Sequence, residues 1–413
     1  MMDVDLSAPL LLDGAVATNL FQTSFAPKNI CQERWILEHP QMLLELQKAF
    51  RAAGSQVLYT PTFGASYSRL AQFGLEQEVT EFNQKLTALT RQAADGAWVA
   101  GAMSATGLEL EPYGDTSFTE MMEVYRQQAQ VLSDSGVDLF VVESLTSISE
   151  ARAAALALKK FHKPVMITLT VDEDGETPLG GTALNALVIL QELGISAFGL
   201  NCSYGTQNIA EIVEQMKPYA KIPIIAKPCA YRYDDDRELL VSLSPEEMAQ
   251  QMKQVLDAGA SYIGGCCGTT PEHIREMKQM LNTYQPAAPK PDLDDQLGDI
   301  ILADTRQLYN LYCENIEFSE PLTCSVDMTD ELLELEEENY DVILVNIDSV
   351  DDARDFAQNA HIAKLPVCFS SHDESALRLA LLLYHGRAMI DCESSIDPEE
   401  LKRIAKKYGA VIY

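Results

Sequence analysis

Short apolar runs recur along residues 1–285, and each is followed by a polar turn and a longer amphipathic stretch. Because the runs are almost continuously hydrophobic, they are typical of strands buried on both faces, as in a parallel sheet. The eight runs are Pro9–Leu12, Gln56–Tyr59, Trp98–Ala102, Asp138–Val142, Val165–Thr170, Ala197–Leu200, Ile222–Ala226 and Ser261–Gly264. The pattern therefore predicts eight parallel strands.

The stretches between these runs have the period of amphipathic helices, and several open on a capping signal such as Ser244-Pro245-Glu246-Glu247. They are Pro40–Ala53, Glu76–Ala94, Thr119–Ser135, Ser147–Lys160, Ala183–Leu193, Gln207–Met216, Pro245–Leu256 and Pro271–Leu281. Eight strand–helix units of this size predict an α/β fold of the (β/α)8 TIM barrel type, which we place at residues 1–285. A doubly wound sheet is the alternative. It would require a glycine-rich phosphate loop after the first strand, and Asp13–Thr18 does not have that pattern.

The last part of the chain alternates in the same way but is shorter. The proline-rich stretch Pro286–Asp292 predicts an extended linker, which we place at residues 286–299. Beyond it we expect a small α/β domain at residues 300–413, too short for a second complete barrel. Its strand candidates are Leu322–Val326, Val342–Ile347, Pro366–Phe369, Ala388–Asp391 and Ala410–Tyr413, and its helix candidates are Thr329–Glu338, Val350–Ala360, Glu374–Tyr384 and Pro398–Lys407.

Composition narrows the classes of function. A formal net charge of −32 argues against nucleic acid and anionic membranes as partners. No apolar run reaches the length of a membrane span, and the start of the chain lacks the basic region of a signal peptide. Nine cysteines spread over a long chain do not form the pattern of a secreted disulfide framework. We therefore expect a cytoplasmic protein.

Two adjacent cysteines, Cys266 and Cys267, stand where the eighth run ends in glycine. Taken alone, the pair fits either a soft metal ion such as zinc or two small buried hydrophobic side chains. The barrel changes this, because Cys202 ends the sixth strand and the carboxyl ends of all strands share one rim. Three thiol ligands with one exchangeable position are the pattern of a catalytic zinc site, where a substrate thiol could bind and lose its proton.

Five motifs at the expected strand ends form a distinctive set. They are Asp13-Gly14-Ala15, Thr62-Phe63-Gly64, Glu143-Ser144-Leu145-Thr146-Ser147, Gly199-x-Asn201-Cys202 and Gly264-Gly265-Cys266-Cys267-Gly268-Thr269. Together they resemble the homocysteine S-methyltransferase family over roughly residues 8–282. Ala105–Gly107 and Leu110–Asp115 look most like the homocysteine module of cobalamin-dependent methionine synthase.

The resemblance implies that Cys202, Cys266 and Cys267 bind zinc. It implies that the zinc-bound thiolate of homocysteine is the nucleophile and that its methylation gives methionine. No catalytic side chain is assigned beyond this metal site.

The resemblance also implies a place for the rest of the substrate. Asp13 and Glu143 would receive the amino group of homocysteine, since carboxylates at the rim suit an ammonium. Backbone N–H groups near Gly14 and Ala15 would face its carboxylate, and Asn201 would line the same site. Each of the two acids could instead serve an internal salt bridge or a helix cap.

Three positions depart from the family pattern. Ala17 stands where members commonly have glycine, and Pro61 stands where asparagine is often found. The stretch that usually ends Lys-Pro-Asn-Ala is Lys227-Pro228-Cys229-Ala230 here, which puts a fourth thiol beside the expected metal. We hypothesise that Cys229 is a fourth ligand that closes the site reversibly when substrate is absent. The alternative is a small apolar residue on the loop.

The leading prediction is a homocysteine S-methyltransferase that resembles methionine synthase. The alternatives are a non-catalytic or regulatory zinc-binding subunit that docks a corrinoid or folate methyl-transfer partner, and a methyltransferase for another thiol or selenol. The donor stays open among methylcobalamin, methyltetrahydrofolate and S-methylmethionine, because no recognisable site in this chain binds any of them. Val342–Asp348, Pro366–Asp373 and Ala388–Ser395 faintly resemble later strands of the pterin-binding barrel of methionine synthase.

Overall fold

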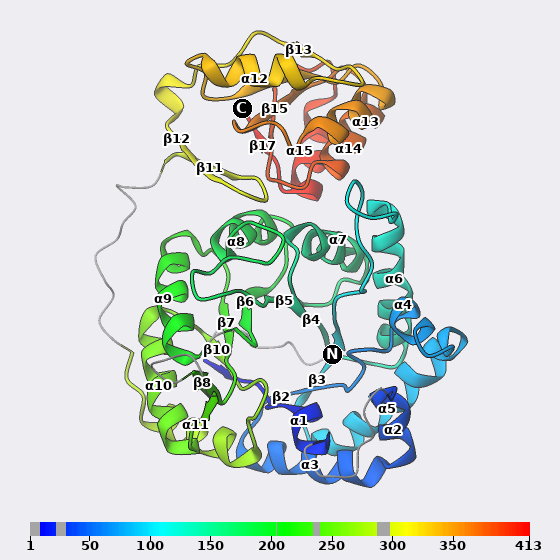
Figure 1. The fold of residues 1–413 in the computed structure, drawn as a ribbon, viewed down its shortest axis with the longest axis vertical. Coiled ribbons are helices and arrows are strands. Elements are labelled where there is room, and N and C mark those ends of the chain that lie inside the picture. The colour runs from blue at the N-terminus through cyan, green and yellow to red at the C-terminus, as the bar shows by residue number, and fades with distance from the viewer. Residues whose placement is uncertain (1–8, 22–29, 204, 234–239, 287–297) are drawn as a thin grey trace. The chain divides into compact units, whose positions relative to one another are not determined.

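The computed structural model describes residues 9–21, 30–203, 205–233, 240–286 and 298–413. Its contacts divide the chain into two units (Figure 1). The first contains the described residues up to Leu179 and from Ile195 to residue 286, and the second contains Gly180–Gly194 and the residues from 298 onward. The predicted linker lies almost entirely outside the described residues, so the boundaries at 285 and 300 stay predictions.

The first unit contains eight parallel strands in the order β1-β10-β7-β6-β5-β4-β3-β2. At the two ends of this order, the Gln56 N–H donates to the Leu11 carbonyl at 2.8 Å and the Leu11 N–H donates to Gln56 Oε1 at 3.0 Å, which joins the sheet into a barrel. The strands are β1 (Leu10–Leu11), β2 (Val57–Tyr59), β3 (Trp98–Met103), β4 (Leu139–Leu145), β5 (Val165–Leu169), β6 (Ala197–Asn201), β7 (Ile224–Lys227) and β10 (Tyr262–Ile263). The predicted TIM-type barrel is confirmed.

Seven long helices surround this barrel (Figure 1): α3 (Pro40–Ala53), α5 (Val79–Ala94), α6 (Phe118–Asp134), α7 (Ile148–Leu158), α9 (Thr206–Met216), α10 (Pro245–Ala258) and α11 (Pro271–Thr283). The signal read at the start of α10 is a true capping box, in which Ser244 Oγ accepts from the Glu247 N–H and the Glu247 carboxylate accepts from the Ser244 N–H. Short elements that the hydrophobic pattern did not predict are α1 (Val16–Phe21), α2 (Gln32–Glu38), α4 (Tyr67–Ala71) and the antiparallel pair β8 (Tyr231–Tyr233) and β9 (Leu240–Ser242).

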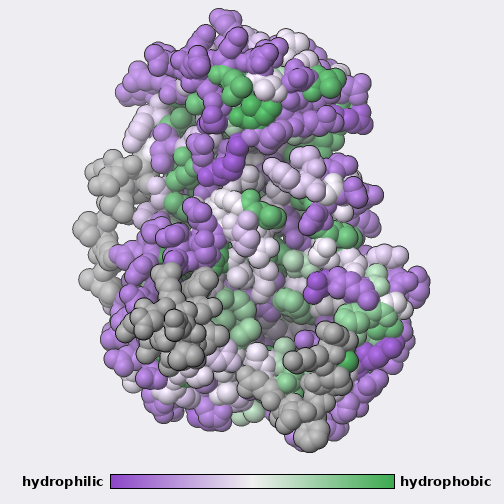
Figure 2. Space-filling view, in the orientation of Figure 1, coloured by the Kyte–Doolittle hydropathy of each residue, from purple (hydrophilic) through white to green (hydrophobic). Residues whose placement is uncertain are grey.

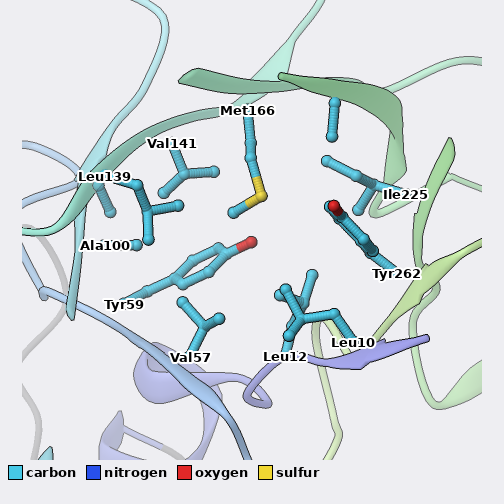
Figure 3. Packing of buried hydrophobic residues seen from close by; sticks show 12 residues of the cluster. Leu10, Leu12, Val57, Tyr59, Ala100, Leu139, Val141, Met166, Ile225 and Tyr262 are labelled. Carbon is cyan, nitrogen blue, oxygen red and sulfur yellow. The ribbon is translucent and has the colours of Figure 1, made fainter. Parts of the chain in front are cut away.

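The barrel interior is a packed hydrophobic core (Figure 3). Alternate residues of each strand point inward, as the period of two requires, so Leu10 and Leu12 pack against Val57, Tyr59 and their counterparts on the other strands. At the surface, the face seen in Figure 2 is mostly hydrophilic, in keeping with the large negative charge. Within the described ranges, no helix is both long enough and apolar enough to cross a membrane.

The helix that follows β5 groups with the second unit. In α8 (Ala183–Gln191), Asn185 Nδ2 donates to the Asp304 carbonyl at 3.2 Å, and just beyond the helix Glu192 pairs with Arg387 at 3.5 Å. These contacts stabilise Gly180–Gly194 against the C-terminal part of the chain. The chain-order division at residue 285 did not anticipate this grouping.

The second unit contains five parallel strands in chain order, β13-β14-β15-β16-β17. Because right-handed crossovers without a reversal of order leave the helices on one face, this order is that of part of a barrel and not of a doubly wound sheet. The elements are β13 (Leu322–Thr323), β14 (Ile343–Asn346), β15 (Val367–Ser370), β16 (Met389–Ile390), β17 (Val411–Ile412), α12 (Thr329–Glu337), α13 (Val350–Asn359), α14 (Glu374–Leu383) and α15 (Pro398–Tyr408). The predicted small α/β fold is confirmed.

A hairpin of β11 (Ile300–Ala303) and β12 (Leu308–Leu311) covers the opposite face of this sheet. Ile300 and Leu302 pack against inward residues of the strands, among them Cys368. The next residue, Phe369, faces the helices, where its ring contacts those of Phe356 and Tyr384. The hairpin thus occupies the side that further strands would close in a complete barrel.

Candidate functional site

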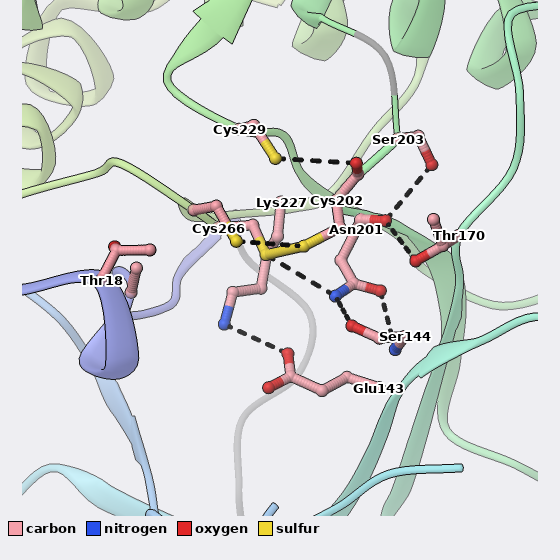
Figure 4. Close-up of a disulfide and its surroundings, with 12 residues drawn as sticks. Thr18, Glu143, Ser144, Thr170, Asn201, Cys202, Ser203, Lys227, Cys229 and Cys266 are labelled. Atoms are coloured by element: carbon pink, nitrogen blue, oxygen red, sulfur yellow. Dashed lines mark hydrogen bonds and ion pairs between the residues drawn. A yellow bond between two sulfur atoms is a disulfide. The ribbon is translucent and has the colours of Figure 1, made fainter. Parts of the chain in front are cut away.

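Four cysteine sulfur atoms meet at the carboxyl-terminal rim of the barrel. Figure 4 labels three of these residues, Cys202, Cys229 and Cys266. Cys202 follows β6, Cys229 follows β7, and Cys266 and Cys267 follow β10, and these three strands are neighbours in the sheet. Their four sulfur atoms all lie within 4.8 Å of one another, and the Sγ atoms of Cys202 and Cys267 are 3.6 Å apart. The topology therefore brings together thiols from three separate loops.

Backbone hydrogen bonds hold these loops in register. The Cys202 N–H donates to the Lys227 carbonyl at 3.3 Å, and the Cys266 N–H donates to the Pro228 carbonyl at 2.8 Å. Cys202 itself has a φ of 56°, in the left-handed region, which few residues other than glycine adopt. This turn directs the chain away from β6 at the point where its thiol enters the cluster.

In this structure Cys202 and Cys266 are joined by a disulfide, while Cys229 and Cys267 are free thiols. The hydrogen bond from Cys229 lowers the pKa of the Cys267 thiol to about 7. The same hydrogen bond, together with burial, raises the pKa of Cys229. Sulfurs this close together form a disulfide when oxidised, and when reduced they can share a metal ion.

The donor set fits zinc. A tetrahedral zinc ion with bonds of about 2.3 Å spaces its sulfur ligands about 3.8 Å apart. The 3.6 Å between Cys202 and Cys267 is close to this value, and 4.8 Å is the upper limit for any pair in the cluster. Thiolates favour zinc over the hard ions magnesium and calcium. Reduction of the Cys202–Cys266 pair would therefore leave a set of ligands from which side-chain rotations can build a zinc site.

Directly beside the thiols lies a group of charges, in which Lys227 and Asp13 are buried and Glu143 is partly exposed. The Lys227 ammonium is 3.2 Å from Asp13 Oδ1 and 3.8 Å from Glu143 Oε2, and it lies 3.6 Å from the centre of the Tyr59 ring. The second Asp13 oxygen, Oδ2, accepts the Tyr59 N–H at 2.8 Å, which ties the first strand to the second. The structure thus brings together the two acids that the sequence analysis singled out.

The two carboxylates share one cation. Burial is the largest influence on both and raises the pKa of Asp13 and of Glu143, although the Lys227 charge opposes it. The negative charge of Asp13 also raises the pKa of Glu143, because like charges repel. With both acids ionised, the three side chains carry one excess negative charge. The group is therefore suited to receive one further cation.

Asn201 links this charged group to the thiols. Its Oδ1 atom accepts from the Ser144 N–H at 2.9 Å and from Thr168 Oγ1 at 2.8 Å. Its Nδ2 atom donates to Ser144 Oγ at 2.6 Å and lies 3.8 Å from Cys266 Sγ. These bonds position the turn at Ser144, whose φ of 60° is also left-handed. The predicted contact between Asn201 and substrate stays a prediction.

Gly14 and Ala15 lie at the start of the first loop. A Cβ on Gly14 would come within 2.6 Å of the Phe50 ring, so the position requires glycine. The Ala15 N–H donates to Thr269 Oγ1 at 3.1 Å, and Thr269 Oγ1 donates in turn to the Cys266 carbonyl at 2.7 Å. The Ala15 N–H is thus engaged here and would face a substrate carboxylate only after exchanging this bond.

Lys227 is the residue whose role the sequence analysis missed. It was visible at the end of the seventh run, but a single lysine there has no distinctive spacing. Its meaning comes from the strand order, which places it across from Asp13 and Glu143. The signal that could have revealed its role is that a lysine and two acids all follow predicted strands and therefore share one rim.

A barrel with a thiol cluster and two neighbouring carboxylates at its rim has the features of a metal-assisted enzyme. Comparison with known proteins identifies the family, since the sequence profile of homocysteine S-methyltransferase matches residues 10–281. The chain belongs to the homocysteine S-methyltransferase family, as its motifs predicted.

Individual relatives agree with this assignment. The chain is 28% identical over 285 residues to methionine synthase of Mycobacterium leprae, an alignment that covers 64% of this chain and 24% of the relative. The chain thus spans about a quarter of the length of this curated relative. The homocysteine methyltransferase MmuM from Escherichia coli is similar in its metallated form, with a TM-score of 0.56, 25% identity and coverage of 66% of this chain and 96% of that one. Its oxidised form has a TM-score of 0.57 at 24% identity, over 65% and 95% of the two chains, and supports the fold.

Proposed function

We propose that this protein transfers a methyl group to the thiol of homocysteine and so forms methionine. The observation that carries the proposal is the adjacency, at one rim, of a thiol cluster suited to zinc and a pair of acids that share one lysine and so carry one excess negative charge when ionised. Homocysteine carries a thiol and an ammonium at the two ends of a short carbon chain. Each end has a matching partner at this rim.

In this proposal, Cys202, Cys266 and Cys267 hold the zinc ion after reduction. When bound, zinc would supply a strong lowering of the pKa of the substrate thiol, so that a thiolate is available at neutral pH without a general base. That the Escherichia coli relative has a metallated form supports a metal in this proposal.

Asp13 and Glu143 would bind the substrate ammonium and so orient the sulfur toward the methyl donor. The charge of Lys227 favours the ionised form of both acids, because it opposes the rise in pKa that burial causes in each. Asn201 fixes the Ser144 turn that follows Glu143. These residues position the reacting sulfur, and positioning alone contributes much of the rate in reactions of this kind.

The methyl donor comes from outside the residues that form this site. Methylcobalamin, methyltetrahydrofolate and S-methylmethionine remain the candidates, and a separate corrinoid or folate-binding protein would deliver the first two. The similarity to one quarter of a methionine synthase supports a chain that works with further domains or partners.

The test is a donor screen with reduced, zinc-loaded protein and homocysteine, with methionine formation as the readout. Methionine formed with one of the three donors supports the proposal. Homocysteine binding without turnover with any donor would instead favour a non-catalytic zinc-binding subunit. Failure to bind homocysteine in the presence of zinc would overturn the proposed function.

A further inference from the structure

Cys229 differs from the other three thiols in its place on the rim. Cys202 and the Cys266–Cys267 pair stand at the ends of β6 and β10, whereas Cys229 lies between them, just past β7. Its thiol donates to the Cys202 carbonyl at 3.6 Å, and its sulfur lies within 4.8 Å of the other three. This orientation toward three other sulfur atoms favours a role as a metal ligand over that of a small apolar residue on the loop.

The backbone on both sides of Cys229 is hydrogen-bonded to the loop that carries Cys266 and Cys267. The carbonyl of Pro228, the preceding residue, accepts the Cys266 N–H at 2.8 Å. The N–H of Ala230, the following residue, donates to the Cys267 carbonyl at 2.8 Å. These two bonds fix the Cα of Cys229 beside the pair, so rotation of its side chain alone decides whether its sulfur joins the centre.

We infer that Cys229 is a fourth sulfur ligand of the metal centre and that the substrate thiol replaces it on binding. The inference rests on the proposed function and specifies which ligand occupies the fourth position of the metal when no substrate is bound. Four sulfur ligands form the closed pattern of structural zinc, and three with an exchangeable fourth form the catalytic pattern. An exchangeable Cys229 gives this rim both states.

The exchange balances in atoms and charge. The bond from the metal to Cys229 Sγ breaks as the bond from the metal to the substrate sulfur forms. The proton of the substrate thiol passes to the departing Cys229 thiolate, which leaves as a neutral thiol. The centre holds four thiolates before and after, so its net charge does not change.

X-ray absorption at the zinc edge tests the resting state by counting sulfur ligands. We expect four sulfurs at about 2.3 Å in the native protein, and three sulfurs with one oxygen or nitrogen at about 2.0–2.1 Å in Cys229→Ala. Cys313→Ser, which changes an exposed cysteine of the second unit, is the matched control and should keep four sulfurs. Loss of a direct ligand should also weaken zinc affinity at least about tenfold.

The selenium analogue of homocysteine tests the exchange. In the native protein it should convert four sulfurs into three sulfurs and one selenium. The inference is overturned by a native resting site with three sulfurs, by an unchanged count in Cys229→Ala, or by four sulfurs without selenium at saturating analogue. In each of those cases the proposed function stands if zinc is stoichiometric and homocysteine binds. Loss of zinc or of homocysteine binding in the native protein overturns the proposed function itself.

Discussion

The ammonium of Lys227 lies 3.2 Å from a carboxylate oxygen of Asp13, and the two side chains are only 4% and 1% exposed. The pair joins residues 214 positions apart in the sequence, at the ends of β7 and β1. Glu143 lies 3.8 Å from the same ammonium, so one cation serves two acids. This imbalance underlies the proposed binding of a substrate ammonium and several of the predictions below.

Replacing Lys227 with methionine should destabilise the protein. The change leaves the buried Asp13 carboxylate and the partly exposed Glu143 carboxylate without their cation, and breaking a buried ion pair such as that of Asp13 typically costs about 3–5 kcal/mol. Urea unfolding of Lys227→Met at neutral pH measures this loss. Lys227→Arg keeps the charge and should lose less. Equal stability of native protein and Lys227→Met would show that Lys227 does not compensate the two acids.

Replacing Asp13 with asparagine should have an effect on stability that depends on pH. Burial raises the pKa of Asp13 above its ordinary value of 3.8, so the folded protein holds this proton more tightly than the unfolded chain. The stability contributed by Asp13 is therefore present below pH 3.8 and is lost as the pH rises through the raised pKa. Relative to native protein, Asp13→Asn should gain stability from acid to neutral pH, as measured by urea unfolding across that range. A constant difference would contradict the raised pKa.

The same acids should decide affinity for the substrate ammonium. Asp13→Asn and Glu143→Gln should each weaken homocysteine binding by about 10–100-fold, because a hydrogen bond to a charged group contributes about 1.5–3 kcal/mol. The matched ligand is 4-mercaptobutanoate, which keeps the thiol and carboxylate but lacks the amino group. Its affinity, measured by calorimetry, should be the same for both variants and native protein. A parallel loss for both ligands would assign the acids a structural role.

Much of this site could be predicted from the order of residues along the chain. Cys202 and the Cys266–Cys267 pair stand at the ends of apolar runs, and the shared rim of a barrel makes such positions neighbours. The same logic located Asp13 and Glu143. What could not be predicted was which groups touch, because contacts such as that of Lys227 with Asp13 depend on strand tilt and side-chain direction.

The hydrophobic pattern also predicted some elements of the fold and missed others. Long periodic helices such as α5 and α10 were predicted within a few residues. The hairpin of β11 and β12 was missed, since its strands are short and β12 is only partly buried. Gly180–Gly194 joins the second unit through specific contacts, such as the pairing of Glu192 with Arg387, that carry no periodic signal.

The cysteines at the ends of β6 and β10 should be required for metal. Cys202→Ser and Cys266→Ser should each lower zinc affinity at least about a hundredfold, because each removes a direct ligand. Loss of a residue that only hydrogen-bonds to a ligand already costs about 10–100-fold in metal affinity. Zinc per chain, measured by mass spectrometry after dialysis against a weak chelator, reports the loss. Cys392→Ser, at an exposed position, should retain native zinc content. Stoichiometric zinc in Cys202→Ser or Cys266→Ser would contradict the ligand assignment.

The most direct test of the zinc–thiol claim is equilibrium binding of homocysteine to reduced protein with and without zinc, measured by calorimetry. We expect one homocysteine per chain in the zinc-loaded protein and affinity at least about a hundredfold lower, or about 2.8 kcal/mol, after zinc is removed. Equal affinity in the two forms, or no binding to the zinc-loaded form, would contradict a metal-held substrate thiol at this rim.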